Sequence, residues 1–479
     1  MLSTSMCQNP SLPESLSLPV PNHTNDNIMK KQIPMIKILF HAALAVVATA
    51  VTSPCSAAGY IDANTLIARP HGPFKGVRYT RYEAMFQGVT SNNRPYRVPC
   101  QIITPTNPNA GSRLLLFDWL VPSTIPTAVG QEQADARYIM KDEFLFGTGL
   151  SYATVRCQLE AIGKRSPISD PSRPWSDGGL DTSSEFISSA GDEFDIVVDY
   201  VKALQTDPSA LQILGTIQRR AAFGYSAGGS RLRGLLRLQT GKGLFDISVV
   251  GGAGNGYTHP GGNDIKYSNA EKAPLAGAGL EMDIQTEADD IVLGGYKARH
   301  EEPNYRVYEF AGAAHLRNID CVEFGLPDPE LANPADIAPF FRALFIAAGN
   351  WCDGIQPPPT LWLGAPNDPL IARDANGNAL VRYVGRQLVN DTGYRLPEVA
   401  VGQNQYIPLA PDYNDGTFFP GTLRFLAGGH VDLTANFTDH GAYVDQITAH
   451  ARALQDGGYL LGEDADAIIL EAQQSDIGK

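Results

Sequence analysis

The feature that most constrains the fold of this chain is a glycine-rich segment between an apolar run and a helical pattern. It contains Gly224-x-Ser226-x-Gly228, and a further glycine, Gly229, follows. Residues 221–223 precede it as a buried strand would, and leucines recur at helical spacing at positions 232, 235 and 236. A serine between glycines where a strand turns into a helix is typical of a nucleophile elbow.

The glycines of such a turn are needed for steric reasons. Strand and helix approach closely beside the serine, so side chains two residues to either side would clash. The first amides of the helix have no intrahelical acceptor and lie at the positive end of the helix dipole. We therefore expect the amide of Ala227 to stabilise an oxyanion formed beside Ser226. The alternative is a structural turn in which the serine only caps the helix.

Charge and residue spacing exclude several classes of partner. The 479 residues carry a net charge of −14, which argues against nucleic acids and anionic membranes. No group of cysteines and histidines has the spacing of a metal site. The glycine-rich residues 251–256 lack the dinucleotide-binding pattern followed by a helix. We expect neither a metal nor an organic cofactor.

Residues 1–58 have the pattern of an export leader. A basic region starts at Met29, residues 38–51 are apolar, and small residues follow up to Ala58. The apolar stretch is short for a membrane span. We expect translation to start at Met29, a signal peptide to be removed after Ala58, and the product to be periplasmic or secreted without a membrane span. A single membrane anchor is the alternative.

Export would determine whether the four cysteines that follow the leader can form disulfides. An even number in an oxidising compartment allows two disulfides, with three possible connectivities. Cys321 and Cys352 flank a predicted helix and form a candidate pair, and four buried free thiols are the alternative. The four residues are Cys100, Cys157, Cys321 and Cys352.

Strand and helix patterns alternate through the first part of the chain after the leader. This alternation predicts a mostly parallel α/β sheet flanked by helices, with its chemistry beyond the carboxyl ends of the strands. The predicted strands are residues 82–89, 96–103, 113–122, 152–157 and 245–250, and the predicted helices are 134–146 and 192–205.

Two later strand patterns lead to an acid and a base for the serine. Residues 279–286 are followed by Asp289, and residues 305–310 are followed by His315. The order serine, aspartate, histidine is that of α/β-hydrolases. A neutral serine needs a base, imidazole has a suitable pKa, and a carboxylate selects its tautomer.

Neighbouring residues compete for both roles. Asp290 and Glu287 lie beside Asp289 in the same acidic run, which alternatively is a solvated loop. His430, after two glycines, is the main competitor of His315. The alanine-rich turn after a late strand favours His315 as the base.

These motifs together resemble the bacterial alpha/beta hydrolase domain family of large, esterase-like proteins. The resemblance rests on residues 224–233, 286–289, 308–315, 351–359, 374–378 and 439–444, and covers nearly all the chain after the leader. It implies the hydrolase fold and a triad of Ser226, Asp289 and His315, but no substrate. A His-Gly-Gly-Gly oxyanion motif is missing, so the second oxyanion donor stays open, with Leu120 or Val121 as candidates.

Two regions are expected to elaborate the fold. Residues 166–184, which contain Trp175, are irregular, and we expect them to lie over the cleft and influence substrate choice. We interpret residues 59–479 as one domain, in which 355–479 form a C-terminal elaboration. Helices are predicted within 327–350 and 431–477.

The sequence therefore predicts an exported serine hydrolase that cleaves a small-molecule or polymeric carboxylic ester through an acyl-enzyme. The same residues would serve an acyltransferase or an amidase. A non-catalytic binding protein that retains the fold is the alternative from a different class. No pattern in the chain indicates an oligomeric state.

Overall fold

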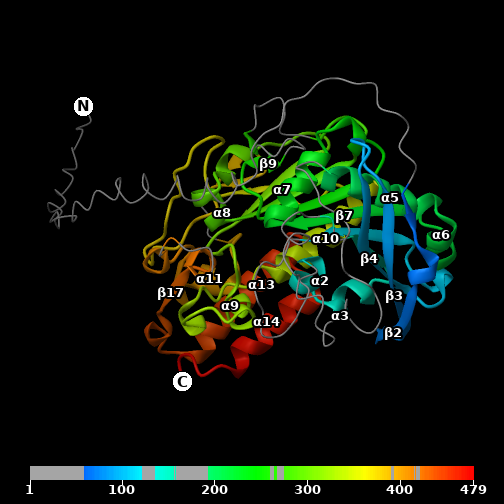
Figure 1. Ribbon diagram of the computed structural model, residues 1–479. Coiled ribbons are helices and arrows are strands. Elements are labelled where there is room, and N and C mark those ends of the chain that lie inside the picture. Colours follow the sequence, from blue (N-terminus) through cyan, green and yellow to red (C-terminus); the bar gives the residue numbers. More distant parts are fainter. Residues whose placement is uncertain are drawn as a thin grey trace, which may run out of the picture.

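A computed structural model describes residues 59–120, 135–155, 157, 192–258, 264–266, 274–389, 393–414, 416 and 421–479. Within these residues, a 13-stranded sheet forms the centre of the molecule (Figure 1). Its strands are β1 (Tyr60–Ile61), β2 (Ile67–Phe74), β3 (Val77–Val89), β4 (Pro95–Pro105), β5 (Leu114–Trp119), β6 (Ser151–Val155), β7 (Arg219–Tyr225), β8 (Ile247–Gly251), β11 (Leu280–Thr286), β12 (Tyr305–Phe310), β13 (Leu361–Trp362), β14 (Tyr383–Val384) and β15 (Gln387–Leu388).

The strand order is β1-β3-β4-β6-β5-β7-β8-β11-β12-β13-β14-β15, with β2 paired to β3. The strands from β6 to β13 run parallel to their neighbours, and the strands at both ends of the sheet pair antiparallel. The mostly parallel sheet that the alternating pattern predicts is therefore present. The carboxyl ends of β5, β7, β8, β11 and β12 all reach the same edge, as expected for parallel strands.

Both faces of the parallel strands are buried, which explains their continuous apolar runs. Leu116 and Phe223 pack into a core cluster on one face, and Phe117 and Ala222 into a cluster on the other. The first face is covered by α2 (Asp135–Met140), α3 (Asp142–Gly147) and α10 (Ala338–Cys352), and the second by α5 (Asp192–Thr206), α6 (Pro208–Leu214) and α7 (Ser226–Leu235).

The C-terminal elements lie at one end of the molecule, coloured orange and red in Figure 1; they are α11 (Pro397–Val401), β16 (Asn404–Ile407), α12 (Leu423–Leu426), β17 (Gly429–Asp432), α13 (His440–Asp456) and α14 (Gly462–Gln474). Helix α13 begins after Asp439, whose carboxylate caps it by accepting a hydrogen bond from the amide of Ala442. Ala451 and Ile469 pack into the same core cluster as Phe340 of α10. The other elements outside the sheet and its covering helices are β9 (Gly256–Thr258), β10 (Asp264–Lys266), α8 (Glu287–Val292) and α9 (Asn318–Phe324).

Two predictions about secondary structure are wrong in detail. The predicted helix 134–146 is divided into α2 and α3, because Lys141 between them has φ of 74°, outside the helical region. The predicted helical region 431–477 begins with a strand, since residues 431–432 belong to β17 and pair with β16.

The predicted disulfide is also wrong, because the four cysteines after the leader are free thiols. Cys321 packs with Phe324 and Leu326 in a small cluster around α9, whereas Cys352 ends α10 against the main core. The two thiols therefore belong to different packing units.

Some predictions fall on parts of the chain outside the described residues. They are the leader 1–58, the segment 166–184 with Trp175, and Val121. Among the helices that are described, none has both the length and the apolar character that crossing a membrane requires.

Candidate active site

Ser226 occupies a strained turn between β7 and α7. Its φ is +51°, and it is the first residue of the helix. A Cβ on Gly224 would lie 2.8 Å from the carbonyl of Gly228, and one on Gly229 would lie 2.8 Å from the carbonyl oxygen of Gly251. Because these contacts are with backbone atoms, only glycine fits at either position. The turn thus has the close approach and the strain that a nucleophile elbow requires.

Asp289 follows β11 in the first turn of α8 and is buried. Its Oδ2 accepts hydrogen bonds from the amide and the hydroxyl of Thr286, at 2.7 and 2.8 Å. The Thr286 hydroxyl in turn accepts from the amide of Asp289, which completes a capping box. One carboxylate oxygen is thereby held by the helix start, and Oδ1 is left to face the histidine.

His315 lies in the loop after β12 and connects the other two residues. Its Nδ1 is 2.6 Å from Oδ1 of Asp289, and its Nε2 is 3.0 Å from Oγ of Ser226. An ionised carboxylate only accepts hydrogen bonds, so Nδ1 carries the proton and Nε2 is free to accept the serine proton. The structure brings these three residues into one hydrogen-bonded chain.

Hydrogen bonds on several sides hold the histidine loop. The hydroxyl of Tyr225 donates to the carbonyl oxygen of His315 at 2.7 Å. The amide of Gly312 donates to Glu287 at 2.8 Å, and its carbonyl oxygen accepts from Asn333 at 2.8 Å. Beyond the histidine, the amide of Leu316 donates to the carbonyl of Leu426 at 3.1 Å. These hydrogen bonds therefore hold the backbone of the candidate base on both sides of the imidazole.

The competing acids of the sequence have other partners. Asp290 lies 2.6 Å from Arg299, and burial followed by the charge of Glu309 raises its pKa well above the usual range. Glu287 bonds to Gly312 and to Arg373, and burial raises its pKa as well. The structure does not bring either acid to His315.

The competing base also lies elsewhere. His430 is on β17, and its Nδ1 is 2.9 Å from the carbonyl oxygen of Ala332. It therefore makes a backbone contact in the C-terminal part of the chain, away from the serine turn.

The expected oxyanion donor, Ala227, is the second residue of α7, where a helix amide has no intrahelical acceptor. Leu120, a candidate for the second donor, directly follows β5, and Trp119 before it pairs with Gly224. The chain therefore brings Leu120 to the same edge of the sheet as Ser226. The assignment of both donors stays a prediction.

Sequence reasoning missed Asp118, a buried carboxyl group on β5. Its Oδ2 accepts hydrogen bonds from the amide of Ala136 and the hydroxyl of Tyr152, both at 3.0 Å. Burial raises the pKa of Asp118 to about 7, although these two hydrogen bonds act in the opposite direction. The overlooked sequence signal was a charged residue inside a continuous apolar strand. Asp118 thereby anchors the start of α2, which forms a wall beside the histidine.

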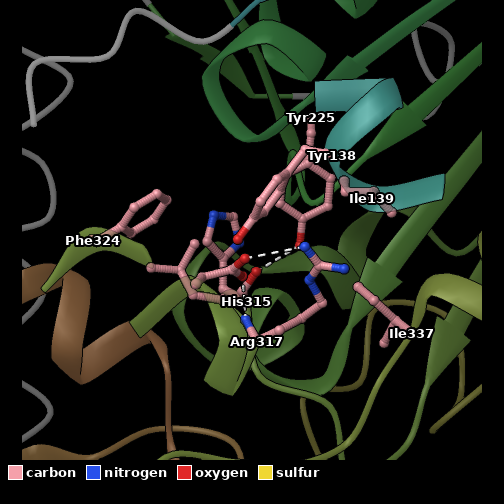
Figure 2. A pocket seen from close by; sticks show the side chains of 9 residues that line it. Tyr138, Ile139, Tyr225, His315, Arg317, Phe324 and Ile337 are labelled. Atoms are coloured by element: carbon pink, nitrogen blue, oxygen red, sulfur yellow. Dashed lines mark hydrogen bonds and ion pairs between the residues drawn. The ribbon is translucent and has the colours of Figure 1, made fainter. Parts of the chain in front are cut away.

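A cavity of about 50 Å³ lies beside His315 (Figure 2). Its walls come from segments far apart in the sequence, namely α2, the end of β7, the histidine loop, α9 and the start of α10. The lining residues are Tyr138, Ile139, Tyr225, His315, Leu316, Arg317, Asp320, Phe324 and Ile337. No sequence pattern pointed to this cavity, because it exists only where these segments meet. Among the described residues, no cluster of three histidine, cysteine, aspartate or glutamate side chains has the arrangement of a metal site.

Solved structures that this chain resembles share little sequence with it. The rice cell wall degrading esterase LipA from Xanthomonas oryzae is 14% identical, and the match covers 39% of this chain and 50% of LipA with a TM-score of 0.26. A putative dienelactone hydrolase from Klebsiella pneumoniae is 10% identical over 60% of this chain and 99% of that protein, with a TM-score of 0.32. The match thus spans half the length of LipA, and similarities this low carry no functional argument.

Sequence comparison is more informative about the family. No curated protein matches the chain. The profile of the family described as alpha/beta hydrolase domain, in contrast, matches residues 76–470, which is most of the chain. The predicted alpha/beta-hydrolase fold and the predicted family are both confirmed, and this protein belongs to the alpha/beta hydrolase domain family.

Proposed function

We propose that the protein is a serine hydrolase that cleaves carboxylic esters through Ser226, His315 and Asp289. The observation that carries the proposal is the hydrogen-bonded chain from Ser226 to His315 at 3.0 Å and from His315 to Asp289 at 2.6 Å. The strained elbow and the free amide end of α7 support it.

In the proposed reaction, Oγ of Ser226 attacks the ester carbonyl carbon while Nε2 of His315 takes the serine proton. The carbonyl oxygen becomes an oxyanion, which the amide of Ala227 stabilises. His315 then gives its proton to the alcohol oxygen as the carbon–oxygen bond breaks, which leaves an acyl-serine. A water molecule, deprotonated by His315, releases the acid and restores the serine.

The class of the enzyme can be tested with a fluorophosphonate probe, which labels an activated serine covalently. Wild-type protein should be labelled and should release protons from simple alkyl esters, and Ser226→Ala should do neither. Labelling that persists in Ser226→Ala would assign the nucleophile to another residue. A folded wild-type protein without labelling or turnover would instead support the non-catalytic binding protein.

The same residues support transfer to an alcohol acceptor or cleavage of amides. Product analysis with an added alcohol distinguishes a transferase, since the transferred ester then exceeds the free acid. Amide analogues of the best ester distinguish an amidase. We expect ester hydrolysis to dominate in both comparisons.

Export through the leader is part of the proposal. The basic region from Met29, the apolar residues 38–51 and the small residues up to Ala58 support it. Expression of the full chain in a bacterium, followed by fractionation and N-terminal sequencing, tests it. The expected product is extracytoplasmic and starts near residue 59, and an uncleaved cytoplasmic product would contradict export.

A further inference from the structure

The cavity beside His315 is small and mostly apolar. Figure 2 shows Phe324 on the opposite side from Ile139 and Ile337, with the two tyrosine rings between them. Its volume is about 50 Å³. Because one water molecule needs about 10–15 Å³ on the same measure, the cavity has room for roughly three to five non-hydrogen atoms.

The charged residues in its wall compensate one another. Arg317 donates to Asp320 at 3.1 Å, and its guanidinium lies 3.9 Å from Asp336 and 4.6 Å from the ring centre of Tyr138. All charge on the arginine is therefore opposed by carboxylates and by an aromatic face. The described lining residues therefore offer an anionic ligand no uncompensated positive charge, so the wall suits a neutral group.

The cavity also has a defined position relative to the proposed chemistry. His315 lines it, whereas Ser226 is not among the described residues that do. In ester cleavage, the histidine that accepted the serine proton must return it to the leaving alcohol oxygen. The alcohol part of the ester therefore lies closer to His315 than the acyl part does.

From these observations we infer that the cavity binds the alcohol part of the substrate and that the enzyme prefers esters of small, neutral, unbranched alcohols with about two to four carbons. This inference rests on the proposed function. The acyl group is not enclosed by this cavity, so its length should matter less.

Two ester series measured with wild-type protein test the inference directly. The first series runs from methyl to octyl acetate, and the second from methyl acetate to methyl octanoate. We expect kcat/KM, measured by proton release, to fall by about tenfold or more beyond butyl in the alcohol series. In the acyl series it should vary by only a few fold. A steeper dependence on the acyl chain, or no dependence on the alcohol, would overturn the inference.

Enlarging the cavity supplies a second test. Ile139→Ala removes side-chain volume from the wall formed by α2, so hexyl acetate should improve relative to methyl acetate by about tenfold. Because Ile139 is buried and the variant risks unfolding, Ile139→Val should give a smaller shift in the same direction. Ile346→Ala is the matched control, since Ile346 lies on α10, is 36% exposed and does not line this cavity. An equal shift in the control would overturn the assignment.

The outcomes separate the two proposals. Turnover of esters and labelling of Ser226, with no selectivity for alcohol length, would refute the cavity assignment and leave the proposed function standing. Absence of both labelling and turnover in a folded protein would refute the proposed function, and the cavity assignment with it.

Discussion

Nη2 of Arg373 lies 2.6 Å from Oε1 of Glu287, 86 residues earlier in the sequence. The other oxygen of Glu287 accepts the amide of Gly312, in the loop that leads to His315. A residue of the C-terminal part of the chain is therefore connected through one buried carboxylate to the backbone of the candidate base. This connection has a measurable consequence.

Arg373→Ala should reduce kcat by up to about 100-fold with a smaller effect on KM, because a small displacement of the base affects the reaction more than binding. Without the guanidinium, the buried Glu287 loses its positive partner and its pKa rises further, which weakens its bond to Gly312. Arg373→Lys should restore part of the rate. Steady-state kinetics on one ester would measure both values.

Arg386→Ala is the matched control for this experiment. Arg386 lies 3.4 Å from Glu301, in the same part of the chain, and its side chain is 73% exposed. Because an exposed ion pair contributes little to the stability of a fold, its loss should change kcat by less than about twofold. An equal loss in both variants would show that Arg373 acts only through general stability.

Removal of the nucleophile and of the base should not be additive. Ser226→Ala and His315→Ala should each lower kcat by a factor on the order of 10³ to 10⁶, and the double variant should be scarcely worse, because the two act as one unit. His430→Ala should keep most of the activity, since its imidazole contacts the carbonyl of Ala332. An inactive His430→Ala beside an active His315→Ala, with both folded by circular dichroism, would reverse the assignment of the base.

Asp289→Asn should lower kcat by a smaller factor than either Ser226→Ala or His315→Ala. The amide of an asparagine can face Nδ1 of His315, and the histidine then adopts the wrong tautomer. The bonds from Thr286 to the other oxygen remain possible, so the start of α8 should stay folded. Kinetics combined with thermal unfolding would separate the two effects, and a wild-type rate would exclude Asp289 as the acid.

Asp118 should make stability depend on pH. Its pKa is about 7 in the folded protein and about 3.9 in an unfolded chain, so the folded state holds this proton more tightly. The protonated carboxyl group contributes on the order of 4 kcal/mol to the free energy of unfolding. This contribution is fully present below about pH 4 and is lost as the pH rises through about 7. At pH 8 the free energy of unfolding of Asp118→Asn should therefore exceed that of wild type. At pH 4 it should be equal to that of wild type or lower. Urea unfolding at both values would measure this, and a pH-independent difference would contradict it.

Much of the fold followed from local sequence patterns. Constraints between residues that are close in the sequence produce three of these patterns. They are the apolar runs of the parallel strands, the helical spacing of α5 and the glycines around Ser226. Those constraints were sufficient to predict the sheet and the positions of Ser226 and His315 at strand ends, whereas the family was predicted from the resemblance of motifs along the whole chain. They were insufficient at Lys141, where a single positive φ divides one predicted helix into two.

The sequence by itself narrowed the candidate acid to three carboxylates that follow one strand, and only the tertiary structure shows that they start a helix and which of them faces the histidine. Successive residues of a helix point about 100° apart, so Glu287, Asp289 and Asp290 face different neighbours. Glu287 meets the backbone of Gly312, Asp289 meets the imidazole of His315, and Asp290 meets Arg299. Which of the three faces the histidine depends on where the loop after β12 crosses this helix. That position is determined by contacts with distant residues, so no local pattern in the chain contains it.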